Sequence, residues 1–188
     1  MLPSRAAAPE HSLAPARDAA RWFMFARARV IGDLGSLASA SVGPGVGLGF
    51  GVDRTLFELG ALLLPSQALS GAELGSAPGS LQLMAASAGV CHELSDGPTL
   101  APCVQFELGS LRGRGRDLAS ATAVSTTWVT AGAGARASVR LFDSLYCVAD
   151  LRGAVPLARP SFGVHGFGRV HEVPALIGRF ELSLEGRL

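Results

Sequence analysis

Charged side chains recur at alternate positions within several otherwise apolar segments of this sequence. In ALIGRFELSLEGRL, residues 175–188, the charges fall on odd positions, whereas the phenylalanine and the leucines fall on even positions. A helix would scatter these charges around its circumference, but a strand places them all on one face. Their nearly balanced signs favour mutual ion pairing within a narrow polar interior. The charged residues with this placement are Arg27, Arg29, Glu58, Glu107, Arg136, Arg140, Asp150, Arg152, Arg179, Glu181, Glu185 and Arg187.

Two cysteines have a spacing that suits disulfide chemistry. Cys91 and Cys103 flank the turn HELSDGPTLAP and lie symmetrically about Gly97. This places them at facing positions of neighbouring strands, where a disulfide can form in an oxidising compartment. The sequence leaves open both this disulfide and two free thiols. Cys147 falls on the apolar face of its segment and is expected to serve as a small apolar side chain.

Glycine occupies every second position from Gly43 to Gly51 in SVGPGVGLGFGV. A dinucleotide-binding loop needs the spacing GxGxxG between a strand and a helix, and neither feature is present here. Because Val46, Leu48 and Phe50 form one apolar face, we expect a strand whose glycine face leaves room for arginines from other strands. The sequence has no Walker, zinc-ribbon or hydrolase-elbow motif, so no cofactor or metal is expected and no catalysis is evident.

The composition is too apolar for an ordinary soluble domain of this size. The mean hydropathy is +0.35 and 16% of the residues are charged, against about 25% in soluble domains. The uncharged stretches 34–52 and 118–135 are rich in small and polar residues, which argues against transmembrane helices. A β-barrel is the remaining way to cross a bilayer with every backbone group hydrogen-bonded. The formal net charge of +1 gives no broad attraction for nucleic acid, so no such partner is expected.

Period-two alternation recurs from residue 21 onward. Short turns and longer Gly/Ser/Ala/Pro-rich loops alternate between the segments, so the short turns gather at one end. This layout indicates an all-β fold, an eight-stranded antiparallel up-and-down transmembrane β-barrel with short periplasmic turns and longer extracellular loops. Residues 1–20 lack the apolar core of a signal peptide and are expected to form a disordered Ala/Pro-rich linker before a barrel domain at 21–188. The predicted strands are at about 21–31, 44–52, 55–64, 80–91, 99–110, 125–140, 144–156 and 174–188.

Alternation alone does not decide which face of the barrel is inside. A soluble lipocalin-like barrel that binds a small apolar ligand would place the apolar face inside. The reverse arrangement is favoured because the strand charges are few, because glycines share the charged face, and because aromatic residues lie near the strand ends. Trp128 is expected at the long-loop end and the others at the short-turn end. The residues predicted to form aromatic girdles at the membrane interfaces are Trp22, Phe50, Phe57, Trp128, Phe142 and Tyr146.

In its strand count, loop asymmetry and final strand RFELSLEGRL, the chain resembles the small eight-stranded outer-membrane β-barrels of Gram-negative bacteria, the OmpA transmembrane-domain and OmpX type. The resemblance covers residues 21–188 and implies a monomer in the cell outer membrane that contacts outer-membrane lipid and lipopolysaccharide. It also implies insertion by the barrel-insertion machinery through the C-terminal strand, which usually ends in Phe but here ends in Leu188. The run RGRGRD, with Arg112, Arg114 and Arg116, either binds lipopolysaccharide phosphates or is simply solvated.

The expected function is that of an integral outer-membrane barrel with a structural or surface-interaction role. Some barrels of the resembled class are enzymes that modify lipid A with a Ser/His pair at the outer rim. Ser161, His171 and Glu172, in the last long loop, are the candidates for such an activity, and ordinary polar loop residues are the simpler interpretation. The soluble lipocalin-like barrel is the third hypothesis.

Overall fold

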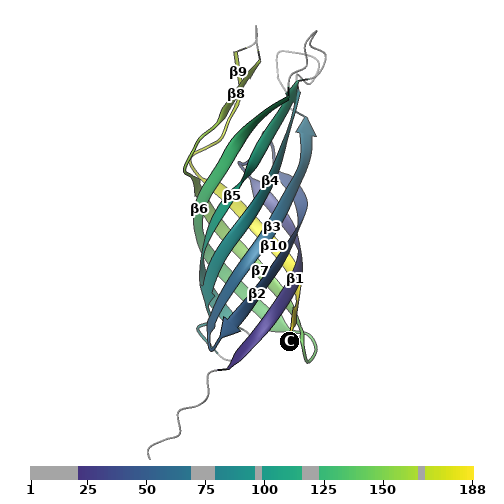
Figure 1. The fold of residues 1–188 in the computed structure, drawn as a ribbon, viewed down its shortest axis with the longest axis vertical. Helices are drawn as coiled ribbons and strands as arrows, with labels where there is room; N and C mark the ends of the chain where they lie inside the picture. Colours follow the sequence, from purple (N-terminus) through teal and green to yellow (C-terminus); the bar gives the residue numbers. More distant parts are fainter. Residues whose placement is uncertain (1–20, 69–78, 96–98, 116–122, 165–167) are drawn as a thin grey trace, which may run out of the picture.

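The computed structural model describes residues 21–68, 79–95, 99–115, 123–164 and 168–188. Eight long strands close into one barrel in which every neighbouring pair is antiparallel (Figure 1). Each barrel strand pairs with the barrel strands before and after it in the chain, and the first pairs with the last, which confirms the predicted up-and-down topology. The barrel strands are β1 (Trp22–Leu34), β2 (Ser41–Val52), β3 (Thr55–Ala68), β4 (Gly79–His92), β5 (Thr99–Gly115), β6 (Ala123–Arg140), β7 (Leu145–Pro156) and β10 (Ile177–Arg187).

Several strands extend further at the long-loop end than the sequence predicted, whereas β10 begins at Ile177 rather than at residue 174. β5 reaches Gly115 rather than residue 110, because its alternation continues through a glycine-rich run of the kind that is typical of loops. Leu111 is buried and Gly113 half-buried on the inward side, while Arg112 and Arg114 are exposed on the outward side. β4 pairs with this extension residue by residue, so the wall rises higher on this side of the barrel. In the part of the chain that the structure describes, no helix has the length and hydropathy needed to cross a membrane.

A small hairpin occupies the segment 157–173 that the sequence predicted as the last long loop. It consists of β8 (Ser161–Val164) and β9 (Gly168–Glu172), which pair only with each other and project beyond the barrel (Figure 1). Phe162 packs against the apolar side chains inside the barrel mouth, and Val173, directly after the hairpin, is fully buried among them. The hairpin is therefore anchored to the barrel interior at its base.

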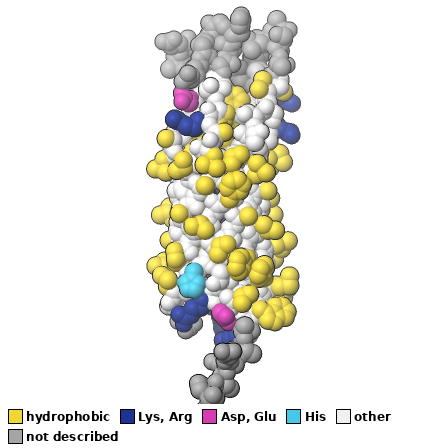
Figure 2. Space-filling model, turned by 60° about the vertical axis from the view of Figure 1, so that its left-hand side comes forward, with side chains coloured by type: hydrophobic (Ala, Val, Ile, Leu, Met, Phe, Trp, Pro, Cys, Tyr) yellow, Lys and Arg dark blue, Asp and Glu magenta, His cyan; other side chains and the backbone are white. Residues whose placement is uncertain are grey.

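The alternation divides the barrel wall into an apolar outer face and a buried inner face. Leu48, Leu59 and Leu151 are 66%, 68% and 66% exposed on the outside. Arg29 and Glu181, whose parity places them inside, are 4% and 1% exposed. Figure 2 shows hydrophobic side chains along the middle of the wall, with charged side chains near its two ends. The barrel is thus the reverse of a water-soluble one, in which the apolar face would be inside.

The interior has three layers rather than one polar lumen. Near the short turns, Phe25, Leu56 and Ala101 pack with the Cys91–Cys103 disulfide. The charged side chains fill the middle. The prediction of a polar interior therefore describes only part of the lumen. Toward the long loops lies a buried apolar cluster that the sequence analysis missed, formed by Ile31, Leu37, Leu62, Leu64, Leu81, Leu83, Ala85, Leu111, Trp128, Val173 and Ile177.

The glycines of β2 allow large side chains of β1 to lie flat against the wall. A Cβ atom on Gly47 would lie 3.1 Å from Arg27 Cγ and 2.8 Å from Glu58 Oε1, closer than such contacts normally come. On the next inward position, Gly49 faces the ring of Phe25 in the same way. The glycines thus make room for an arginine, as expected, and also for an aromatic ring, which the sequence analysis did not anticipate.

Candidate functional site

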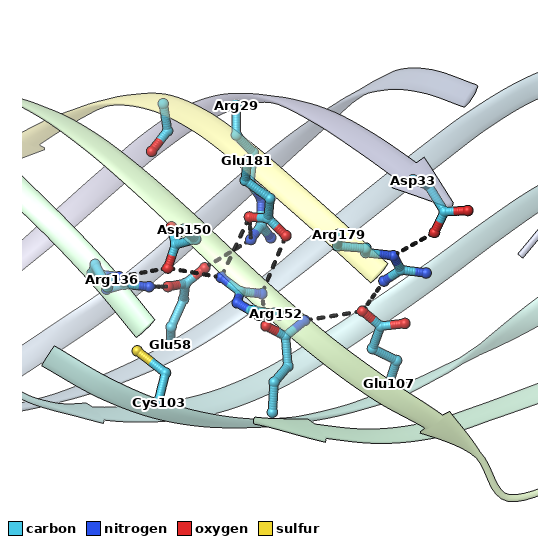
Figure 3. Close-up of polar contacts among 12 residues, drawn as sticks. Arg29, Asp33, Glu58, Cys103, Glu107, Arg136, Asp150, Arg152, Arg179 and Glu181 are labelled. Atoms are coloured by element: carbon cyan, nitrogen blue, oxygen red, sulfur yellow. Dashed lines mark hydrogen bonds and ion pairs between the residues drawn. The ribbon is translucent and has the colours of Figure 1, made fainter. Parts of the chain in front are cut away.

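The central charged layer is built around Asp150 on β7, which contacts three arginines. Its Oδ1 atom lies 3.0 Å from Arg136 Nε and 3.1 Å from Arg152 Nη2. Its Oδ2 atom lies 3.3 Å from Arg27 Nη1. All four side chains are at most 6% exposed, and Figure 3 shows Arg136 and Arg152 directed toward the Asp150 carboxylate. One carboxylate therefore holds together side chains from β1, β6 and β7.

Glu58 and Glu181 extend this network across the barrel. Glu58 accepts hydrogen bonds from Arg27 Nε at 2.9 Å and Arg136 Nη2 at 2.8 Å. Arg29 Nη1 lies 3.1 Å from an oxygen of each of these glutamates. Arg152 Nη1 donates to Glu181 Oε1 at 3.1 Å. Most members have two or more partners, so removing one leaves several buried charges without compensation.

A second group of charges lies next to this network, around Arg179 on β10. Arg179 Nε donates to Asp33 Oδ2 at 2.8 Å, and its Nη1 atom contacts Glu107. Glu107 also accepts from Trp128 Nε1 at 3.3 Å and from Thr130 Oγ1 at 3.1 Å. This group contains one arginine and two carboxylates, so its net charge is −1. The central network contains four arginines and three carboxylates, so its net charge is +1.

Gln105 on β5 joins the two groups. Its amide oxygen accepts from Arg152, and its Nε2 atom donates to Glu107 Oε1 at 3.1 Å. Two cavities of about 10 Å³ each lie beside Gln105, one bordered by Arg136 and the other by Thr130. Each has about the volume needed for a single water molecule, so the middle of the barrel is filled.

A third group of charges closes the short-turn end. Arg187 Nε donates to Glu185 Oε1 at 2.8 Å, and Arg187 Nη2 donates to Glu93 Oε1 at 3.2 Å. The Arg187 guanidinium carbon also lies 4.8 Å from the ring centroid of Phe23 and 4.1 Å from that of Tyr146. Cation–π contacts of this kind add to the ion pairs. The arginine thus fills the barrel mouth at this end.

The predicted set of inward charges contains one residue that does not belong to the interior. Arg140 is the last residue of β6, and its side chain is 62% exposed. It lies 3.5 Å from Asp143 in the following turn, because the strand has passed the barrel rim at this point and inward parity no longer leads into the lumen. Asp33 and Glu93 were missed, although Asp33 follows Arg27 and Arg29 at the same parity and could have been found. The remaining predicted residues, Arg27, Arg29, Glu58, Glu107, Arg136, Asp150, Arg152, Arg179, Glu181, Glu185 and Arg187, all take part in interior ion pairs or hydrogen bonds.

Two of the six predicted girdle aromatics point into the barrel instead of outward. Trp128 is fully buried, because its position on β6 has the same parity as the inward Thr130 and its indole N–H donates to Glu107. Tyr146 shares the parity of Asp150 and lies beneath Arg187. The outward aromatics at the short-turn end are Trp22, Phe50, Phe57 and Phe142, which are 73%, 48%, 37% and 72% exposed.

Two of the cysteines are bonded to each other, whereas the candidate catalytic residues lie on different faces of the β8–β9 hairpin. Cys91 and Cys103 form a disulfide between β4 and β5, while Cys147 is exposed on the outer face. In the β8–β9 hairpin, Ser161 lies opposite Glu172. His171 lies opposite Phe162, so its side chain projects from the other face of the hairpin than Ser161. A Ser/His pair of the kind required by the lipid A hypothesis is therefore not formed by these residues.

His171 is half-buried at the base of the hairpin. Burial lowers its pKa, because the charged imidazolium loses solvation, while a hydrogen bond with the backbone of Ser36 acts in the opposite direction. Among the described residues, no group of three or more His, Cys, Asp or Glu side chains is arranged to hold a metal ion. Arg112 and Arg114 are exposed on the outer face of β5, and Arg116 lies outside the described residues.

Comparison with known proteins identifies the fold. No protein-family model matches the sequence, and no curated protein sequence is significantly similar to it. A major outer membrane protein from Thermus thermophilus superposes with a TM-score of 0.60 at 16% identity, covering 87% of this chain and 99% of that one. Neisserial surface protein A gives a TM-score of 0.53 at 13% identity, with 90% and 99% covered. Ail, the attachment invasion locus protein of Yersinia pestis, gives 0.52 at 9% identity, with 89% and 97% covered.

These similarities extend over nearly the whole of each solved barrel. At such low sequence identity they establish the fold, and the strand count and topology of the present chain agree with it. The resemblance inferred from the sequence is confirmed at this level: the chain has the fold of the small eight-stranded outer-membrane β-barrels.

Proposed function

We propose that this chain is an integral protein of a bacterial outer membrane with a structural and surface-interaction role and no catalysis. The observation that carries the proposal is the reversed placement of side chains. Large apolar residues such as Val46 (59% exposed) and Leu184 (54% exposed) cover the outer wall, while paired charges are buried inside. In water this surface would be a large aggregation-prone patch, whereas lipid tails solvate it. An arginine or lysine on the lipid-facing side would cost roughly 2–4 kcal/mol at the bilayer midplane.

The interior supports a structural role rather than a pore. The apolar cluster beneath the long loops, the charged layer, the layer around the disulfide and the Arg187 group at the short-turn end together occupy the lumen. Eight-stranded barrels have an interior that side chains can just fill. We therefore expect no measurable conductance.

The loops and strand ends are the proposed contact surfaces. The exposed Arg112 and Arg114 lie beyond the outward apolar residues of β5, at a height where phosphates of outer-leaflet lipopolysaccharide would lie. The β8–β9 hairpin projects beyond the barrel on the same side (Figure 1). We propose that this end is extracellular, that the short turns are periplasmic, and that the C-terminal strand β10 is recognised by the insertion machinery.

The test is expression behind a secretion signal in a Gram-negative host, followed by membrane fractionation and electrophoresis in SDS with and without boiling. An embedded barrel remains folded in SDS and changes mobility on boiling, and it stays in the membrane fraction after high-salt washing. A protein that is released by the wash and shows one mobility would contradict the proposal. Conductance steps in planar bilayers would overturn the filled-lumen part of it alone.

A further inference from the structure

The outer wall contains an apolar groove over β2 to β6 with a volume of about 1090 Å³. At its centre, Ala88 on β4 pairs with Leu59 on one side and Phe106 on the other. A small side chain therefore lies between two large ones, 68% and 45% exposed, that stand out from the wall. One level closer to the short turns, Val90 lies in the same way between Phe57 and Val104, so the groove continues along the strands.

A polar hollow of about 600 Å³ follows the groove at the short-turn end. It shares Phe57 with the groove, and its other lining residues include Asp53, Arg54 and His92. His92 is the next outward residue after Val90 on β4, and its Nδ1 atom lies 3.3 Å from Thr55 Oγ1. Figure 2 shows a histidine and basic side chains below hydrophobic ones at the lower end of the wall. An apolar channel thus leads directly into a site that contains a guanidinium group and an imidazole ring.

We propose that the groove and the hollow together bind one glycerophospholipid from the leaflet around the short-turn end. This inference rests on the proposed membrane location. An acyl chain occupies the groove, and the phosphate is bound by the Arg54 guanidinium and the His92 ring, since guanidinium groups bind phosphate through charge-assisted hydrogen bonds. Asp53 carries the opposite charge, with Oδ1 accepting the backbone N–H of Arg21 at 3.1 Å. A headgroup that carries both a phosphate and an ammonium, such as phosphoethanolamine, can place its phosphate at Arg54 and His92 and its ammonium at Asp53.

The opposite wall lacks this combination. There the outward positions of β7 and β10 place Leu151 directly beside Phe180, and Ala149 beside Leu182. Arg140 and Asp143, beyond the end of β6, border neither the groove nor the hollow. A lipid that merely coats the barrel would use both walls equally, whereas the proposed lipid uses one.

Native mass spectrometry of the protein released from detergent micelles tests this inference, with phosphatidylethanolamine as the probe. We expect one lipid adduct that survives activation longer than the rest. In the double variant Arg54→Gln/His92→Gln, its retention falls about tenfold, because the charged phosphate contacts are lost. Ala88→Phe fills the groove and lowers retention independently. The matched controls Arg140→Gln and Ala149→Phe line neither the groove nor the hollow and leave retention unchanged.

Variants are first checked for the folded mobility in SDS, so that loss of the barrel is not mistaken for loss of binding. Equal retention by the site variants and the controls would overturn the inference and leave only a general lipid coat. Equal retention of dioleoylglycerol, which lacks the phosphate, would overturn the headgroup assignment. Neither result would bear on the location of the protein in a membrane, which fractionation tests separately.

Discussion

The middle of the barrel and its long-loop end solve the same packing problem with different chemistry. Both are filled by inward side chains of the same strands. On β1, Arg29 belongs to the charged layer, and the next inward residue, Ile31, belongs to the apolar cluster. On β3, Glu58 is followed after Gly60 by Leu62 in the same way. On these two strands, ion pairs thus give way to hydrocarbon within one or two inward positions, although Asp33, beyond Ile31 on β1, forms an ion pair again, with Arg179.

The two layers differ in how they depend on their partners. Apolar packing has no direction, so a lost side chain costs its burial and the cavity that it leaves. Ion pairs in a buried layer need every member, because a charge left without its counter-charge keeps its full desolvation penalty. The charged layer is thus expected to specify strand register more strictly, and the apolar layer to tolerate more variation. Four variants test this difference.

Asp150→Asn should have the largest effect. The substitution keeps the shape of the side chain but removes the negative charge shared by Arg27, Arg136 and Arg152. We expect the free energy of unfolding to fall by about 3–5 kcal/mol, measured by urea unfolding in detergent micelles. A loss below about 1 kcal/mol would mean that the charged layer is no more sensitive than the surface.

Leu83→Ala tests the apolar layer. Leu83 is fully buried in the cluster below the long loops, and its truncation should lower the free energy of unfolding by about 2–4 kcal/mol in the same measurement. Leu59→Ala is the matched control, because this side chain faces outward and lipid or detergent replaces its contacts. An equal loss for both variants would contradict the assignment of inner and outer faces.

The double variant Cys91→Ala/Cys103→Ala tests the layer near the short turns. The disulfide closes a loop with a sequence separation of 12, so its removal should lower the free energy of unfolding by about 2–3 kcal/mol. Cys147→Ala, at an exposed outward position, should leave it unchanged. If a reducing agent fails to lower the stability of the native protein, the disulfide does not contribute as described.

Arg140→Ala should have the smallest effect. Its ion pair with Asp143 is exposed on both sides, and such pairs contribute less than about 1 kcal/mol. High salt should remove even this contribution, while the buried layer remains protected from screening. A cost comparable to that of Asp150→Asn would show that the barrel rim needs its charges as much as the middle does.

The strand number, the antiparallel up-and-down order and the separation of faces were predictable, because each follows from a local period of two. The positions at which the strands end were harder to predict. β5 continues to Gly115, since the alternation of Arg112 and Arg114 with small residues is a weak signal that is also typical of loops. The sequence analysis did not predict the short β8–β9 hairpin for the same reason, because its Gly-rich sequence lacks a clear apolar face.

Within the candidate site, parity identified most of the inward charges, whereas the expectation of an aromatic girdle misplaced Trp128. An aromatic residue near the end of an expected strand suggests an interface girdle, but its parity with Thr130 places it inside, where Glu107 accepts its N–H. Arg140 shows the limit of the same rule, because parity has meaning only where the strand still borders the lumen.

By itself, the sequence determined which side chains share a face of the wall, since neighbouring residues of a strand must point to opposite sides. Only the tertiary structure decided which of the inward side chains meet. Closing the barrel brings Arg29 on β1 against Glu181 on β10, 152 residues apart, and Arg27 against Asp150 on β7. It also gathers inward leucines of separate strands into one cluster at a single height. Strand tilt and register set these heights, and both depend on closure of the whole sheet, so no local pattern encodes them.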